Sequence, residues 1–133
     1  MSDILIFIDA SFIIALASSN DQWHEKAKNI AKKIPIKDRV ISNLVMSEAI
    51  TMIGKKVGGE IARKIFFYIE DNYILYQDHP FLNRRVIETF RKFDGKLSFA
   101  DSFSVEIMKE LKITKIVSFD SDFDEVDGIV RIH

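Results

Sequence analysis

Five short apolar runs have the length and composition of buried β-strands, and they restrict the folds open to this chain. They are ILIFI (4–8), RVI (39–41), YILY (73–76), KIVSF (115–119) and IVRI (129–132). A short apolar run bounded by polar residues is typical of a parallel strand covered on both faces. Because the runs alternate with helix-like stretches, the sequence predicts the α/β class, as a three-layer α/β/α sandwich with a mostly parallel sheet.

The stretches between these runs carry apolar residues at helical spacing. One of them has Trp23, Ala27, Ile30 and Ile34 at i, i+4, i+7 and i+11, and Pro35 ends it. Further helix boundaries are predicted at the capping and turn residues Ser42 or Asn43, Gly58, Gly59, Pro80, Asp94, Gly95 and Ser98. The pattern therefore supplies helices for the outer layers of the sandwich.

The composition limits the compartment and the kinds of site that the chain can build. A chain of 133 residues fits one domain, so we expect residues 1–133 to form a single unit. The absence of cysteine excludes thiolate metal sites and suits a reducing, cytoplasmic setting. The apolar stretches are too short for a membrane span, and MSDILIF (1–7) lacks the basic region of a signal peptide, so we expect no membrane association.

The formal net charge of −1 differs from that of a typical non-specific nucleic-acid binder, which is basic as a whole. Any such binding must therefore be local. The basic residues form three clusters, which are Lys26, Lys28, Lys32 and Lys33; Lys55, Lys56, Arg63 and Lys64; and Arg84, Arg85, Arg91 and Lys92. Solvated helix faces and local phosphate contacts are both consistent with these clusters.

Four acidic residues are placed where they can meet at one edge of the predicted sheet. Asp9 and Asp120 follow apolar runs, Asp101 opens a helix, and Glu48 lies in the helix after RVI without Lys or Arg at i±3 or i±4. The carboxyl ends of parallel strands meet at one edge, where α/β proteins bind ligands. Converging carboxylates need a cation, and oxygen-only ligands favour Mg²⁺ or Mn²⁺ in sites that commonly hydrolyse phosphate esters.

Three of these acids, Asp9, Asp101 and Asp120, also have a purely structural interpretation. Asp9 could cap the short helix that follows it. Ser98 and Asp101 have the spacing of a capping box, which is compatible with a second role because one carboxylate oxygen can face the cap while the other faces a metal. Asp120 could belong to a polar loop before the last strand.

Other motifs for binding sites fail on particular residues. Asp120, Asp122 and Asp124 fall at positions 1, 3 and 5 of an EF-hand loop, but Glu125 replaces the required Gly and Arg131 replaces the bidentate Glu. Neither dinucleotide-binding nor P-loop glycine motifs occur. Each histidine stands alone, so none is assigned to a metal.

Short motifs follow one another in a characteristic order along nearly the whole chain. They are IDAS (8–11), NDQWHEKA (20–27), the helix that contains Glu48, LSFADS (97–102) and SFDSDFD (118–124). This set resembles the PIN domain, and most closely the VapC-type toxins of prokaryotic toxin–antitoxin pairs. The resemblance implies a five-stranded parallel sheet and an endoribonuclease that depends on Mg²⁺ or Mn²⁺. The partners it implies are an RNA substrate (tRNA, rRNA or mRNA), an antitoxin protein and a second copy of the chain in a homodimer.

The resemblance also implies roles for individual residues. The positions that match the family's catalytic and metal-binding acids are Asp9, Glu48, Asp101 and Asp120. Asp122 could share or take the role of Asp120, because the spacing of the C-terminal motif varies in the family. Ser11 and Ser118 match small hydroxyl residues near the metal, where Thr is frequent.

Three other interpretations were weighed against this one. A haloacid-dehalogenase-like phosphatase needs a second acid at the position of Ser11, and a receiver domain needs an acidic pair at the end of its first strand, where Asp9 is followed by Ala10. A PIN-like module that serves in RNA processing, or that binds RNA or a partner without cutting, remains the alternative to a toxin.

Overall fold

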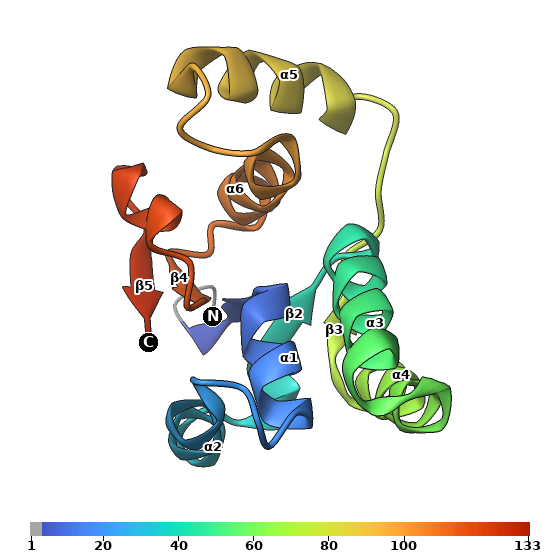
Figure 1. Cartoon of the computed structure of the whole chain (residues 1–133). Helices are drawn as coiled ribbons and strands as arrows, with labels where there is room; N and C mark the ends of the chain where they lie inside the picture. Colours follow the sequence, from blue (N-terminus) through green and yellow to red (C-terminus); the bar gives the residue numbers. More distant parts are fainter. Residues whose placement is uncertain (1–3) are drawn as a thin grey trace.

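Five parallel strands form the central sheet of the protein (Figure 1). The computed structural model describes residues 4–133. Residues 1–3, which belong to the expected single domain and to the segment judged to lack a signal peptide, lie outside the described residues. The strands are β1 (Ile6–Ile8), β2 (Arg39–Ile41), β3 (Ile74–Leu75), β4 (Lys115–Val117) and β5 (Val130–Ile132). Their order is β3-β2-β1-β4-β5, with every neighbouring pair parallel. The predicted α/β class is confirmed, and the sheet is wholly parallel rather than mostly so.

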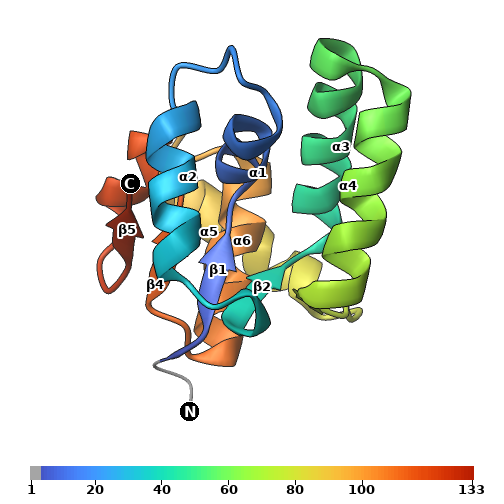
Figure 2. The same cartoon turned by 90° about the horizontal axis from the view of Figure 1, so that it is seen from below.

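Helices cover both faces of this sheet. They are α1 (Ala10–Ala17), α2 (His24–Lys33), α3 (Asn43–Val57), α4 (Gly59–Asn72), α5 (Leu82–Phe93) and α6 (Phe99–Leu111), with short 3₁₀ turns η2 (Ile36–Asp38) and η3 (Ser121–Glu125). Figure 1 shows α5 and α6 on one side of the sheet and α1 with α2 on the other. The α3–α4 hairpin packs beside α1 and extends along it in Figure 2. Within residues 4–133, no helix has the length and apolar character needed to cross a membrane.

The central strands are short but fully buried, which is why they read as continuous apolar runs. Phe7 of β1 pairs with Val40 of β2 on one side and with Ile116 of β4 on the other. All three side chains have no exposed surface. A strand covered on both faces must be apolar at successive positions, because neither face meets water. Four of the five runs extend beyond their strands by one or two residues at an end, whereas RVI coincides with β2.

The helix that carries Glu48 begins and ends at residues recognisable in the sequence. Ser42 precedes α3, and its hydroxyl accepts a hydrogen bond from the Val45 N–H at 3.1 Å. Gly58 separates α3 from α4 with a φ of 98°, a conformation that side chains with a Cβ rarely adopt. Pro80 was predicted inside the first turn of the next helix but lies before it, because α5 begins at Leu82.

The cap of α3 should be measurable in the stability of the whole fold. Replacing the buried Ser42 by Ala removes the acceptor for the Val45 N–H, and we expect the free energy of unfolding to fall by about 1 kcal/mol. Urea denaturation gives this difference. Ser19, an exposed serine in the α1–α2 turn, serves as the control, and Ser19→Ala should change stability by less than about 0.5 kcal/mol. Equal effects of the two changes would contradict the capping role.

Candidate metal centre and active site

Asp9 lies at the carboxyl end of the central strand, between β1 and α1. It occupies the N-cap position of α1, but its side chain makes no capping hydrogen bond. Instead the hydroxyls of Ser11 and Ser118 both donate to its Oδ2, at 2.9 Å and 2.7 Å. The carboxylate is therefore held by two side chains that come from opposite ends of the chain, and the capping interpretation of Asp9 is wrong.

The same two serines join the start of α1 to the segment that follows β4. The Ser11 hydroxyl accepts the Phe119 N–H at 2.9 Å, and the Ser118 hydroxyl accepts the Asp120 N–H at 3.0 Å. Each hydroxyl thus donates to Asp9 and accepts from the backbone beside Asp120. This pattern fixes the path of the chain that carries Asp120 relative to Asp9.

Three further carboxylates gather close to one another at this edge of the sheet. The Asp120 Oδ1 accepts the Asp122 N–H at 2.9 Å, which starts the 3₁₀ turn η3. One carboxylate oxygen from each of Asp101, Asp120 and Asp122 lies within 4.8 Å of the other two. Oxygen ligands on opposite sides of a Mg²⁺ ion are separated by about 4.2 Å, so these atoms are within reach of a shared divalent ion.

Asp101 stands in the first turn of α6 with its backbone N–H capped by Ser98, whose side chain also lowers the pKa of the Asp101 carboxyl. The Ser98 hydroxyl accepts the Asp101 N–H at 2.9 Å. In the described part of the chain, the carboxylate does not return a hydrogen bond to the Ser98 N–H, so only half of the predicted capping box forms. One oxygen of this carboxylate lies within 4.8 Å of oxygens of Asp120 and Asp122.

Glu48 is brought to the same cluster by α3. Its carboxyl is partly desolvated by the surrounding protein, and the charges of Asp9 and Asp120 act on it. Both effects raise the pKa of Glu48. The structure therefore brings together all the acids that the sequence assigned to this site, from β1, α3, α6 and the β4–η3 segment.

The cluster is electrostatically unfavourable unless a cation is present. Burial raises the pKa of Asp9, and burial together with the charges of Asp9, Asp120 and Glu48 raises the pKa of Asp101 to about 7. Among residues 4–133, no salt bridge involves any of these four acids. An all-oxygen donor set that forms no salt bridge fits a divalent metal ion.

Sequence reasoning missed one residue that supports the cluster. Arg131 of β5 binds Asp124 through two hydrogen bonds, at 2.9 Å and 3.0 Å, and donates a third to the Ser118 carbonyl at 3.2 Å. Asp124 therefore has the structural role that its loop position indicated. No local pattern in the sequence indicates these contacts of Arg131, because they depend on the pairing of β5 with β4.

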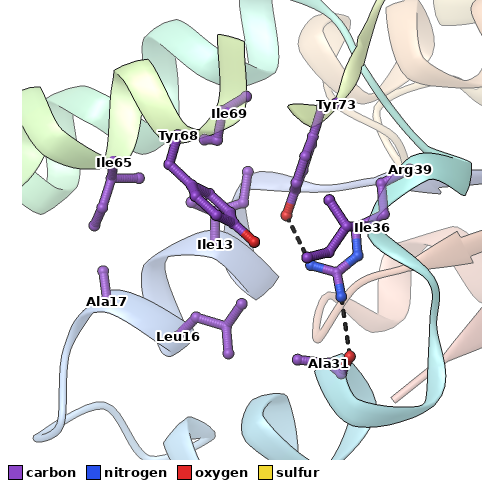
Figure 3. A pocket seen from close by; sticks show the side chains of 10 residues that line it. All are labelled: Ile13, Leu16, Ala17, Ala31, Ile36, Arg39, Ile65, Tyr68, Ile69 and Tyr73. Carbon is purple, nitrogen blue, oxygen red and sulfur yellow. Dashed lines mark hydrogen bonds between the residues drawn. The ribbon is translucent and has the colours of Figure 1, made fainter. Parts of the chain in front are cut away.

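An apolar pocket of about 330 Å³ opens between α1, α2 and α4, away from the acids (Figure 3). Leu16, Ile65 and Tyr68 line it, and Arg39 lies at one side. The Arg39 guanidinium donates to the Tyr73 hydroxyl and to the carbonyls of Ala31 and Ile34 near the end of α2. These contacts place a buried positive charge beside an apolar surface.

The raised pKa of Asp101 should appear in the pH dependence of stability. Between its ordinary value of 3.8 and about 7, the folded protein holds a proton that the unfolded chain has lost, so stability falls as pH rises through this range. Asp101→Asn removes the repulsion, and we expect it to raise the Tm of the protein in EDTA at pH 8 and to raise it less at pH 5. Thermal denaturation at both pH values measures the difference.

Asp124→Asn provides the control of opposite sign. Arg131 lowers the pKa of Asp124, so its ionised form stabilises the fold at neutral pH and this contribution is lost as pH falls. Its replacement should not raise the Tm at pH 8. If Asp101→Asn also failed to raise the Tm at pH 8, the carboxylates would not be repelling one another.

Comparison with known proteins agrees with this geometry. The family model of the PIN domain matches residues 6–129. The 23S rRNA-specific endonuclease VapC20 of Mycobacterium tuberculosis is 29% identical over 132 residues, which cover 96% of this chain and 98% of that protein. The crystal structure of Mycobacterium tuberculosis VapC20, described as a Sarcin–Ricin loop cleaving toxin, superposes with a TM-score of 0.84 at 26% identity and covers 94% of this chain and 96% of its own.

A toxin–antitoxin complex from Klebsiella pneumoniae superposes with a TM-score of 0.72 at 16% identity, covering 94% of this chain and 95% of its own, and supports the fold. The five-stranded sheet expected from the motifs of the sequence is confirmed, as is their resemblance to VapC-type toxins. The chain belongs to the PIN domain family.

Proposed function

We propose that this protein is a divalent-metal-dependent endoribonuclease and the toxin of a VapBC-type toxin–antitoxin pair. The observation that carries the proposal is the convergence of Asp9, Glu48, Asp101 and Asp120, none of which forms a salt bridge within residues 4–133. These four acids are proposed as the catalytic residues. Residues 1–133 are proposed to act as one domain, since the buried core extends from β1 to Val126.

The ion would be Mg²⁺ or Mn²⁺, because every donor in the cluster is a carboxylate oxygen. The residues that would hold it are Asp9, Glu48, Asp101, Asp120 and Asp122. When bound, such an ion lowers the pKa of water and stabilises negative charge on phosphate oxygens. Asp122 is included because its carboxylate lies in the same group as those of Asp101 and Asp120.

The serines would keep the acids in a fixed arrangement. Ser11 and Ser118 donate to one oxygen of Asp9, which favours its ionised form and limits its rotation. Their acceptance of backbone N–H groups holds Asp120 at a constant position relative to Asp9. A pre-arranged site stabilises developing charge without reorganising during the reaction.

Water, rather than the 2′-hydroxyl of the RNA, would attack the phosphorus. Hydrolysis of this kind leaves a 5′-phosphate and a 3′-hydroxyl. The substrate would be tRNA, rRNA or mRNA in the cytoplasm. Because the 29% identical relative is a 23S rRNA-specific endonuclease that cleaves the Sarcin–Ricin loop, an oligonucleotide of this loop and intact 23S rRNA are the first substrates to test.

An antitoxin would bind the apolar pocket between α1, α2 and α4. The Klebsiella pneumoniae structure with the same fold is a toxin–antitoxin complex. Leu16, Ile65 and Tyr68 offer the apolar surface, and Arg39 offers a charge that favours an acidic residue in the bound segment. A homodimer is also proposed, because Leu44 of α3, Phe81 just before α5 and Ile87 of α5 are apolar residues with 40%, 70% and 47% of their surface exposed.

The catalytic assignment is tested by removing single carboxylates. Asp9→Asn and Asp101→Asn each remove a ligand charge, and we expect each to abolish RNA cleavage, by a factor of roughly 100 or more, while the fold remains. Cleavage of the Sarcin–Ricin loop oligonucleotide with Mg²⁺, Mn²⁺ or EDTA, followed by end mapping, gives the readout.

Glu125→Gln is the matched control, because Glu125 is an exposed acid in η3 that makes none of the contacts described above. It should cleave as the unaltered protein does. Wild-type activity in Asp9→Asn, cleavage in EDTA, or products with cyclic phosphate ends would each refute the proposed mechanism.

The alternative function, an RNA-processing or RNA- or partner-binding module, differs in its need for metal. A module that only binds has no need of a tight divalent site. Calorimetric titration with Mn²⁺ should show binding that is lost in Asp101→Asn and weakened in Asp120→Asn or Asp122→Asn. Whichever of Asp120→Asn and Asp122→Asn weakens Mn²⁺ binding more identifies the fourth ligand. No detectable Mn²⁺ binding by the unaltered protein would favour the binding module.

A further inference from the structure

An aromatic stack lies directly beside the acid cluster. The Trp23 and Phe119 rings are nearly parallel, with centroids 5.4 Å apart and planes inclined by 11°. Phe119 is the residue between Ser118 and Asp120, and its N–H is bound by Ser11. The stack is therefore attached to the same backbone segment that positions Asp120.

Two lysines accompany this stack. The Lys26 ammonium lies 5.2 Å from the centroid of the Trp23 ring. Lys56, at the end of α3, forms an ion pair with Asp21 at 3.8 Å. The Asp21 carboxylate in turn accepts a hydrogen bond from the backbone N–H of Trp23 at 2.8 Å. Both lysine side chains are exposed. The Lys26 charge thus lies over the indole, and the Lys56 charge, on a different helix, is linked to the Trp23 backbone through Asp21.

The sequence pattern assigned Trp23 to the apolar face of α2, but its exposure differs from that of a core residue. Ala27, one turn further on, is fully buried, whereas Trp23 and Phe119 are only partly buried. An indole with accessible surface next to a nuclease site can form contacts that a buried indole cannot. Stacking on aromatic rings is the common way in which proteins hold unstacked nucleobases.

The negative charge of the acid cluster also calls for an RNA-binding surface of cationic or uncharged groups beside it. Four converging carboxylates repel a polyanion, and the chain as a whole carries a net charge of −1. The affinity for RNA beyond what a bound metal ion contributes must therefore come from cations and uncharged surfaces beside the cluster. Trp23 with Lys26 and Lys56 supplies both, next to the segment that bears Asp120.

We propose that Trp23, together with Lys26 and Lys56, forms a subsite that holds one unstacked base of the RNA and its adjacent phosphates beside the acid cluster. The base lies against the indole, where the flexible Lys26 side chain makes way for it, and the lysines contact the phosphates. This inference rests on the proposed function, since it names the part of the RNA that the same site recognises. It predicts a preference for single-stranded or looped RNA.

The chain offers a direct reporter, because Trp23 is its single tryptophan. A single-stranded RNA decamer in EDTA should change the Trp23 fluorescence on binding. A decamer with the same phosphates but abasic sugars should bind roughly 5- to 100-fold more weakly, which corresponds to the loss of one stacking contact. Equal affinity for the two oligonucleotides would overturn the proposal, as would binding with unchanged fluorescence.

Variants separate stacking from packing. Trp23→Leu keeps an apolar contact with Phe119 and should weaken binding of a labelled RNA by roughly 5- to 100-fold, whereas Trp23→Phe should restore most of the affinity. Phe67→Leu is the matched control, because Phe67 is an exposed ring on α4 with Arg63 at 5.1 Å from its centroid. Its affinity should be unchanged. If Trp23→Leu does not fold, the abasic comparison with the unaltered protein still decides the proposal.

The lysines are tested by salt dependence. Lys26→Ala should reduce the slope of log affinity against log salt by about 0.7, the value for one phosphate contact on a single strand. An unchanged slope would remove Lys26 from the subsite. Failure of the proposed function would look different. The protein would then neither cleave RNA nor bind either the normal or the abasic oligonucleotide.

Discussion

The hydrogen bonds around Asp9 are the interaction on which the candidate site depends. Two serine hydroxyls donate to a single oxygen of this buried carboxylate, and each accepts an N–H from the segment after β4. A hydroxyl that donates and accepts at once links two elements in a defined geometry. Because β1 and β4 are neighbours in the sheet, this linkage costs no long-range distortion, and it brings Asp120 beside Asp9.

The same arrangement brings several carboxylates together in a partly desolvated place. The pKa values of Asp9, Glu48 and Asp101 are all raised by desolvation and by the charge of Asp120. Folding brings these charges together at a cost that sheet packing and the caps at Ser42 and Ser98 offset. Functional sites are where such local conflicts are expected, since a cation relieves them.

Several parts of the fold and the site could be predicted because they rest on local signals. The strands could be recognised from apolar runs, and the caps of α3 and α6 from Ser42 and Ser98. The acids were placed by their positions relative to those elements. Neither the contact between Arg131 and the Ser118 carbonyl nor the stack of Trp23 on Phe119 could be predicted, because they join segments that have no local pattern in common.

The sequence by itself determined the α/β class, the approximate limits of the elements and the set of acidic candidates, because burial on both faces and helix capping leave periodic and local traces in the chain. Only the tertiary structure decided that Asp9 is held by serines rather than capping α1, and that Asp122 joins Asp101 and Asp120. It also decided which cations lie beside the acids. These features depend on the order and register of the strands, which are set by packing over the whole domain and not by any one segment.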